Sequence, residues 1–148
     1  MDTLKPTISG ERIIATMIEL ARSSSLHRII VAGSKGPRQL FELYRRGYSR
    51  VATTANCGLP RGQYDVALVE WQLHSLKALE TTLDWLVHFL APSSVLVIWI
   101  DASESTNQRK LGSILEKLGF RLEAGTRCEG GLAIAARRLD ANQQAIAA

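Results

Sequence analysis

Short, uninterrupted apolar runs in the sequence limit the folds that this chain can adopt. Residues 29–32 read Ile-Ile-Val-Ala, and residues 95–100 read Val-Leu-Val-Ile-Trp-Ile. A strand with one face in solvent alternates apolar and polar residues, whereas a strand that is buried on both faces is apolar throughout. These runs are therefore typical of the interior strands of a parallel sheet that carries helices on both faces.

Helices are predicted on either side of the first of these strands. Ser9 is placed to cap one helix, because apolar residues then recur at spacings of three and four from Ile13 to Ala21. After the strand, Pro37 suits the first turn of a second helix and Gly47 suits its left-handed end. The predicted inner stripe of this second helix is Leu40, Phe41 and Tyr44.

Strands and helices continue to alternate along the chain. The other predicted strands are residues 50–54, 65–70, 121–126 and 132–137, with a hairpin at Gly130-Gly131. The other predicted helices are residues 75–90, ended by a turn at 91–94, and residues 104–118. This order predicts a doubly wound α/β domain: a mostly parallel sheet of about six strands, helices on both faces and a C-terminal antiparallel hairpin.

The chain has 148 residues, the size of one ordinary domain. We expect a flexible arm over residues 1–8, a single domain over 9–139 and a frayed tail over 140–148. No apolar run approaches the roughly 18–20 residues of a membrane span, and the start lacks a signal-peptide pattern, so a cytoplasmic protein without membrane contact is expected. Cys57 and Cys128 are expected to be reduced thiols, and no His or Cys spacing indicates a metal site.

Basic side chains are concentrated in one part of the sequence. Between residues 28 and 61, Glu42 is the only acidic residue, against Arg28, Lys35, Arg38, Arg45, Arg46, Arg50 and Arg61. An anionic partner would bind there first. The other interpretation is that these are solvated residues of helix faces and strand ends. A nucleic-acid partner is not indicated.

Ligands of doubly wound sheets bind outside the carboxyl ends of the strands, where the strand order reverses. In this sequence, three segments follow or end the predicted strands near that edge. They are residues 33–36, 53–56 and 70–74. Binding or catalytic side chains are therefore expected in these segments.

The order of elements over residues 29–139 resembles the class I S-adenosylmethionine-dependent methyltransferase family. The most specific segments are Tyr64-Asp65-Val66-Ala67-Leu68-Val69-Glu70, Leu73-His74-Ser75-Leu76, Leu90-Ala91-Pro92, Leu118-Gly119-Phe120 and Gly131-Leu132-Ala133-Ile134-Ala135-Ala136-Arg137. The resemblance implies S-adenosylmethionine as a small-molecule cofactor and methyl transfer to an acceptor that the sequence does not identify. It also implies a set of cofactor-binding residues: Gly33, Ser34, Lys35, Gly36, Thr53, Thr54, Glu70 and Trp71.

The sequence departs from the family pattern near the cofactor. Apolar or small residues at 30–32 replace the usual acidic residue, and Thr53 with Thr54 replaces the usual ribose-binding carboxylate. Only the ten residues 55–64 separate the second predicted strand from the next, too few for the family's third strand and its helices. The strand of Thr53 is then expected at the sheet edge, where a second copy of the chain could dock.

Glu70 and His74 are the candidate catalytic residues. Glu70 could neutralise the sulfonium or orient a nucleophile, or it could be a solvated acid at a strand end. His74 could act as a general base or simply begin a helix. Trp71 is either a platform for the ligand or a packing residue, and Asp101 suits a turn better than catalysis.

Two other functions stay open on the sequence alone. Lys35 and Arg38 flank a helix N-terminus, which suits a nucleotide or another phosphate-bearing ligand. Alternatively, the chain is a noncatalytic interaction module, in the form of a homodimer. For the cofactor site, we expect Gly33→Trp to abolish binding and to leave the fold intact.

Overall fold

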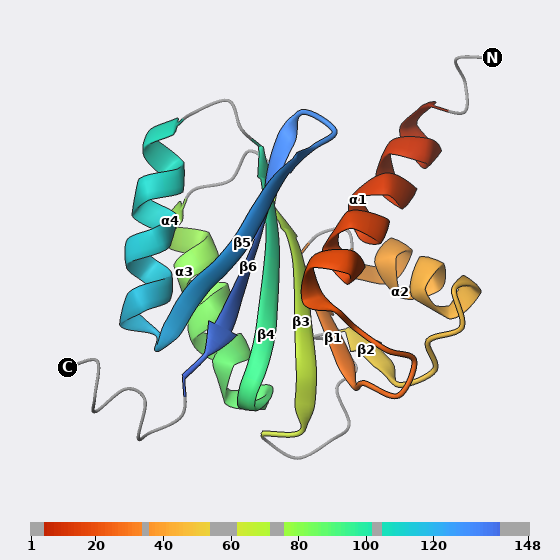
Figure 1. Cartoon of the computed structure of the whole chain (residues 1–148), viewed down its shortest axis with the longest axis horizontal. Coiled ribbons are helices and arrows are strands. Elements are labelled where there is room, and N and C mark those ends of the chain that lie inside the picture. Colours follow the sequence, from red (N-terminus) through yellow and green to blue (C-terminus); the bar gives the residue numbers. More distant parts are fainter. Residues whose placement is uncertain (1–4, 34–35, 54–61, 72–75, 102–104, 140–148) are drawn as a thin grey trace.

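Within the residues that the computed structural model describes, six strands form one sheet in the order β2-β1-β3-β4-β6-β5 (Figure 1). These residues are 5–33, 36–53, 62–71, 76–101 and 105–139. Strands β2, β1, β3 and β4 are parallel, and β6 pairs antiparallel with both β4 and β5. The predicted doubly wound sheet with a C-terminal antiparallel hairpin is confirmed.

The elements alternate as the apolar runs predict. The strands are β1 (Ile29–Ala32), β2 (Val51–Thr53), β3 (Tyr64–Trp71), β4 (Leu90–Asp101), β5 (Phe120–Cys128) and β6 (Gly131–Arg138). The helices are α1 (Lys5–Ala21), α2 (Gly36–Arg45), α3 (Leu76–Leu86) and α4 (Ser105–Lys117), with a short 3-10 helix η2 (Val87–Phe89) before β4.

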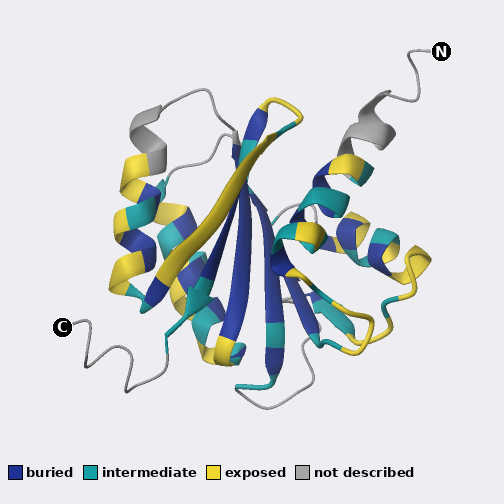
Figure 2. Cartoon of the chain, viewed as in Figure 1, coloured by how far each residue is buried: buried dark blue, intermediate teal, exposed yellow. Residues whose placement is uncertain are grey.

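Two apolar clusters lie on the two faces of the sheet. On one face, α1 and α2 bring Met17 and Leu43 against Val31 of β1 and Val97 of β4. On the other face, the leucines of α3 and α4 pack against the alternate residues of the same strands. Figure 2 shows the inner strands buried, whereas β5 is exposed along most of its length. Every residue of β1 is buried, which explains its uninterrupted apolar sequence.

Helix α1 begins earlier than the predicted Ser9 start. It begins at Lys5, so part of the arm expected over residues 1–8 belongs to the helix. Pro6 lies in its first turn, where a missing backbone N–H removes no helical hydrogen bond. No helix in the part of the chain that the structure describes is long and apolar enough to cross a membrane.

The predicted helix over residues 75–90 is shorter than expected. Helix α3 ends at Leu86, η2 follows, and β4 already begins at Leu90. The turn predicted at residues 91–94 lies inside β4 as a register irregularity between the pairs Tyr64–Leu90 and Val66–Val95. Ser93 has a φ of 63° there. Residues 91–94 therefore form a bulge rather than a turn, because β4 resumes its pairing with β3 at Val95.

The predicted inner stripe of α2 is wrong for two of its three residues, since only Leu40 is half-buried. Phe41 and Tyr44 are 67% and 51% exposed, and the buried residues of the helix are Gly36, Gln39 and Leu43. The predicted end of the helix is confirmed. Gly47 has a φ of 93°, and the N–H groups of Gly47 and Tyr48 donate to the carbonyl oxygens of Tyr44 and Leu43.

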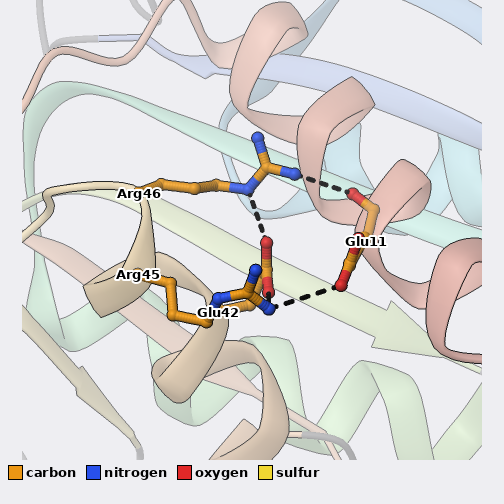
Figure 3. Close-up of polar contacts among 4 residues, drawn as sticks. All are labelled: Glu11, Glu42, Arg45 and Arg46. Atoms are coloured by element: carbon orange, nitrogen blue, oxygen red, sulfur yellow. Dashed lines mark hydrogen bonds and ion pairs between the residues drawn. The ribbon is translucent and has the colours of Figure 1, made fainter.

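Two arginines at the end of α2 form ion pairs with Glu42 of the same helix, and Arg45 also pairs with Glu11 of α1 (Figure 3). Arg45 lies 3.1 Å from Glu42 and 3.4 Å from Glu11 of α1, and Arg46 lies 2.9 Å from Glu42. At strand ends, Arg28 donates from its side chain to Gln63 and Arg50 to the carbonyl oxygen of Leu26. These contacts favour the structural interpretation of the basic segment for these four arginines.

The final hairpin turns at Glu129 and Gly130, both of which have positive φ values of 50° and 78°. Gly131 then begins β6 beneath the Trp99 ring, whose Nε1 donates to the carbonyl oxygen of Cys128 at 2.9 Å. Cys128 carries a free thiol, and its Sγ lies 3.3 Å from Oγ1 of Thr16. Cys57 lies outside the described residues.

Candidate ligand-binding site

The strand order reverses next to β1. The chain passes from β1 outward to β2 and then returns to β3 on the other side of β1, with all three strands parallel. The carboxyl ends of β1 and β3 therefore border the crevice where doubly wound sheets hold their ligands. Gly33 follows β1 at this edge, and Glu70 and Trp71 end β3 there.

Gly33 allows the ends of these two strands to lie very close together. Its φ is 104°, and a Cβ atom at this position would lie 2.9 Å from the backbone oxygen of Glu70. A side chain is therefore excluded twice, by the backbone conformation and by the neighbouring strand. The expectation that Gly33→Trp leaves the fold intact is contradicted by this geometry. By contrast, a Cβ atom on Gly36 would make ordinary contacts with Thr53 and Val31.

Glu70 is a buried carboxylate. Its residue is only 6% exposed, and its Oε1 accepts a hydrogen bond from Nε2 of Gln39 at 3.0 Å. The interpretation of Glu70 as a solvated acid at a strand end is therefore wrong. A carboxylate taken out of water requires hydrogen-bond partners to stay charged, and α2 brings one of them to this position.

Gln39 is the residue of this site that the sequence analysis missed. It is 2% exposed, and within the described structure its Oε1 is buried without a hydrogen-bond partner. The predicted inner face of α2 consisted of apolar residues only. The spacing of Gly36, Gln39 and Leu43 at three and then four residues was the available signal.

Thr53 and Trp71 are two further residues of the predicted site that the structure describes. Thr53 ends the edge strand β2 and is 8% exposed. Trp71 is half-buried and packs against the apolar cluster beneath α3 and α4. Successive residues of a strand point to opposite faces, so Trp71 is directed away from the face on which Glu70 meets Gln39. A ligand-binding role for Trp71 stays a prediction.

Several predicted site residues fall outside the described part of the chain. They are Ser34, Lys35, Thr54 and His74. Arg38 is described and lies exposed on α2, and the backbone of Asp101 ends β4 opposite Gly131. The cofactor and catalytic roles expected for this group stay predictions.

No family model and no curated protein matches the sequence. The structure, however, is similar to many solved ones. A S-adenosylmethionine-dependent methyltransferase from Aquifex aeolicus superposes with a TM-score of 0.67 at 13% identity, covering 93% of this chain and 98% of that chain. A 1,6-didemethyltoxoflavin-N1-methyltransferase from Burkholderia thailandensis, solved with S-adenosylhomocysteine, gives 0.59 at 15% identity, over 92% and 82% of the two chains.

A third similar structure performs a different reaction. The 4+2 cyclase SpnF superposes with a TM-score of 0.61 at 13% identity, covering 87% of this chain and 80% of that chain. One fold therefore carries more than one chemistry, and the likeness shows the fold alone.

Proposed function

We propose that this chain, which has the class I S-adenosylmethionine-dependent methyltransferase-like fold, binds S-adenosylmethionine at the carboxyl ends of β1 and β3. The proposed activity is the transfer of the methyl group to an acceptor. The observation that carries the proposal is the buried carboxylate of Glu70, held by Gln39 at the reversal of strand order.

The described side chains of the site fit a cationic ligand. Glu70 offers a carboxylate, and Oε1 of Gln39 is a second buried acceptor without a donor among the described residues. Both groups attract an ammonium or sulfonium and repel a phosphate, which requires donors. This arrangement favours S-adenosylmethionine over a nucleotide phosphate at this position.

When bound, S-adenosylmethionine supplies an electrophilic methyl group. The contribution of the protein is positioning and local charge, because methyl transfer depends chiefly on the alignment of the two reactants. Gly33 brings no side-chain atoms to this edge, and the hydroxyl of Thr53, at the end of β2, would bond the ribose. Glu70 balances positive charge, and Gln39 holds its carboxylate in one orientation.

Calorimetric titration tests the proposal. The protein is titrated with S-adenosylmethionine, S-adenosylhomocysteine, NADP and ATP under the same conditions. We expect saturable binding of the first two, and we expect Glu70→Gln to weaken S-adenosylmethionine about 10-fold more than S-adenosylhomocysteine, whose sulfur carries no charge. Binding of NADP and ATP only would assign the site to phosphate-bearing ligands. Absence of binding for all four ligands would contradict the proposal.

A noncatalytic homodimer is the second candidate, and exposed aromatic residues favour it. Phe41 is 67% and Tyr44 51% exposed on α2, beside the edge strand β2, where the Tyr44 hydroxyl donates to the Val51 carbonyl at 3.5 Å. Unpaired strand edges and exposed aromatic residues are common features of protein interfaces. Analytical ultracentrifugation tests this candidate: a dimer that Phe41→Glu dissociates would support it, and a monomer at all concentrations would exclude it.

A further inference from the structure

A hollow lies between the end of α1 and the exposed strand β5. Its volume is about 390 Å³. The charged residues that line it are Arg22, just beyond α1, Arg121 and Glu123 of β5, and Arg137 of β6. We call it the arginine groove. None of these residues belongs to the candidate site described above.

Two of the arginines face each other across the hairpin. Arg121 is paired directly with Arg137 in the antiparallel register. Like charges at opposed positions destabilise a sheet. The register shifts between Leu122 and Ala124, so Glu123 is the additional residue of a β-bulge. Its carboxylate accepts from Nε of Arg137 at 3.1 Å and lies 3.9 Å from Nη2 of Arg121.

The third arginine occupies a position that usually favours glycine. Arg22 has a φ of 52° at the end of α1, where the N–H of Ser23 donates to the carbonyl oxygen of Ile18. A left-handed conformation is uncommon for a side chain of this kind. Within the described part of the chain, the guanidinium of Arg22 makes no hydrogen bond or ion pair. The groove therefore holds three positive charges and one negative charge.

The arginine groove lies at the opposite end of the sheet from Glu70. Arg137 is paired with Val95 at one end of the regular part of β4, whereas Glu70 is paired with Trp99 near the other. Figure 1 shows β5 and β6 running together from the hairpin at one end of the sheet to the far end. A ligand in the groove and a ligand at the candidate site would not compete for the same residues.

We propose that the arginine groove binds the phosphate group of a small phosphorylated molecule. Planar guanidinium groups match the oxygens of a phosphate, and the excess positive charge in a concave surface attracts an anion. The groove holds a small group, and its charges are confined to one hollow rather than spread along a stripe, as nucleic-acid binding requires. The carboxylate of Glu123 is already paired with Arg137. We therefore expect the groove to bind its ligand without a chemical reaction.

Titration with inorganic phosphate and with pyrophosphate tests this site. Both titrations are run at constant ionic strength, set with sodium chloride, so that general screening does not change. We expect saturable binding that Arg22→Asn and Arg121→Ala each weaken about 10-fold or more, since each removes a charge-assisted hydrogen bond. Asparagine tolerates the left-handed conformation, so Arg22→Asn preserves the end of α1. Unchanged thermal unfolding verifies the fold of both variants.

The matched control is Arg127→Ala, which removes the same charge from an exposed position on β5 outside the groove. The proposal predicts that this variant binds phosphate as tightly as the unmodified protein. Binding that Arg127→Ala weakens equally, or no saturable binding at all, would overturn the proposal. Tighter binding of a single-stranded DNA oligonucleotide with the same dependence on Arg22 would overturn it in favour of a nucleic-acid surface.

Discussion

The side chains of Gln39 and Glu70 meet inside the protein, with the amide nitrogen 3.0 Å from the carboxylate oxygen. The contact joins α2 to the end of β3, across the point where the strand order reverses. Both residues are almost fully buried. A buried polar pair of this kind can stabilise the fold through its hydrogen bond, bind a ligand, or do both.

A double-mutant cycle measures the stability that this contact contributes. Gln39→Leu leaves a buried carboxylate with one donor fewer, and we expect the free energy of unfolding to fall by about 1–3 kcal/mol. Glu70→Leu leaves the Gln39 amide unpaired and should cost a similar amount. The double variant should lose clearly less than the sum of the two, as measured by urea denaturation. Additive losses would show that the two side chains do not interact in solution.

Alanine substitutions at Gly33 and Gly47 test the close approach of β1 and β3, with Gly47 as the control. Both have positive φ values, but only at Gly33 would a Cβ atom meet backbone. Gly47→Ala should cost about 1 kcal/mol for the left-handed conformation alone. Gly33→Ala should cost at least about 2 kcal/mol more, because the strand ends must separate. Equal midpoints of thermal unfolding for the two variants would contradict this geometry.

The hairpin offers a second comparison between glycines. A Cβ atom on Gly131 would overlap the Trp99 ring, whereas one on Gly130 would meet nothing within 4 Å. We expect Gly131→Ala to lower the free energy of unfolding by about 3 kcal/mol and to change the near-ultraviolet circular dichroism of Trp99. Gly130→Ala should cost about 1 kcal/mol and leave that spectrum unchanged. An unaltered Trp99 signal in Gly131→Ala would be inconsistent with the packing.

The ion pairs of Glu42 are expected to contribute little. Arg45, one of its partners, has a side chain that is 58% exposed, so water and salt screen the interaction. Glu42→Gln should therefore lower the free energy of unfolding by no more than about 1 kcal/mol in dilute buffer. In about 1 M salt, the difference from the unmodified protein should disappear. A larger loss that persists in salt would indicate that Glu42 has a packing role.

The sequence was most informative where one physical cause decided the structure. Residues 29–32 form β1 as predicted, because a run without polar residues has no alternative to burial on both faces. Gly47 ends α2 as predicted, because its φ of 93° favours glycine. The mostly parallel sheet and the final antiparallel hairpin followed from the alternation of elements.

The sequence was misleading where two causes competed. Gln39 was overlooked because its burial depends on Glu70, which is distant in sequence and adjacent only in the folded sheet. Phe41 and Tyr44 look like core residues by hydrophobicity alone, but the helix presents Leu43 to the sheet instead. The sequence around Pro92 is typical of a turn, yet pairing with β3 and β6 on either side keeps it within β4.

The most direct test of the cofactor site is a nuclear magnetic resonance titration with S-adenosylhomocysteine. The backbone amide signals of the isotopically labelled protein are followed as the ligand is added. We expect saturable shifts at Gly33, Gly36, Gln39 and Trp71, and unchanged signals at Arg121 and Arg137. Shifts confined to the β5–β6 hairpin, or no shifts at millimolar ligand, would contradict the assignment of this edge of the sheet as the cofactor site.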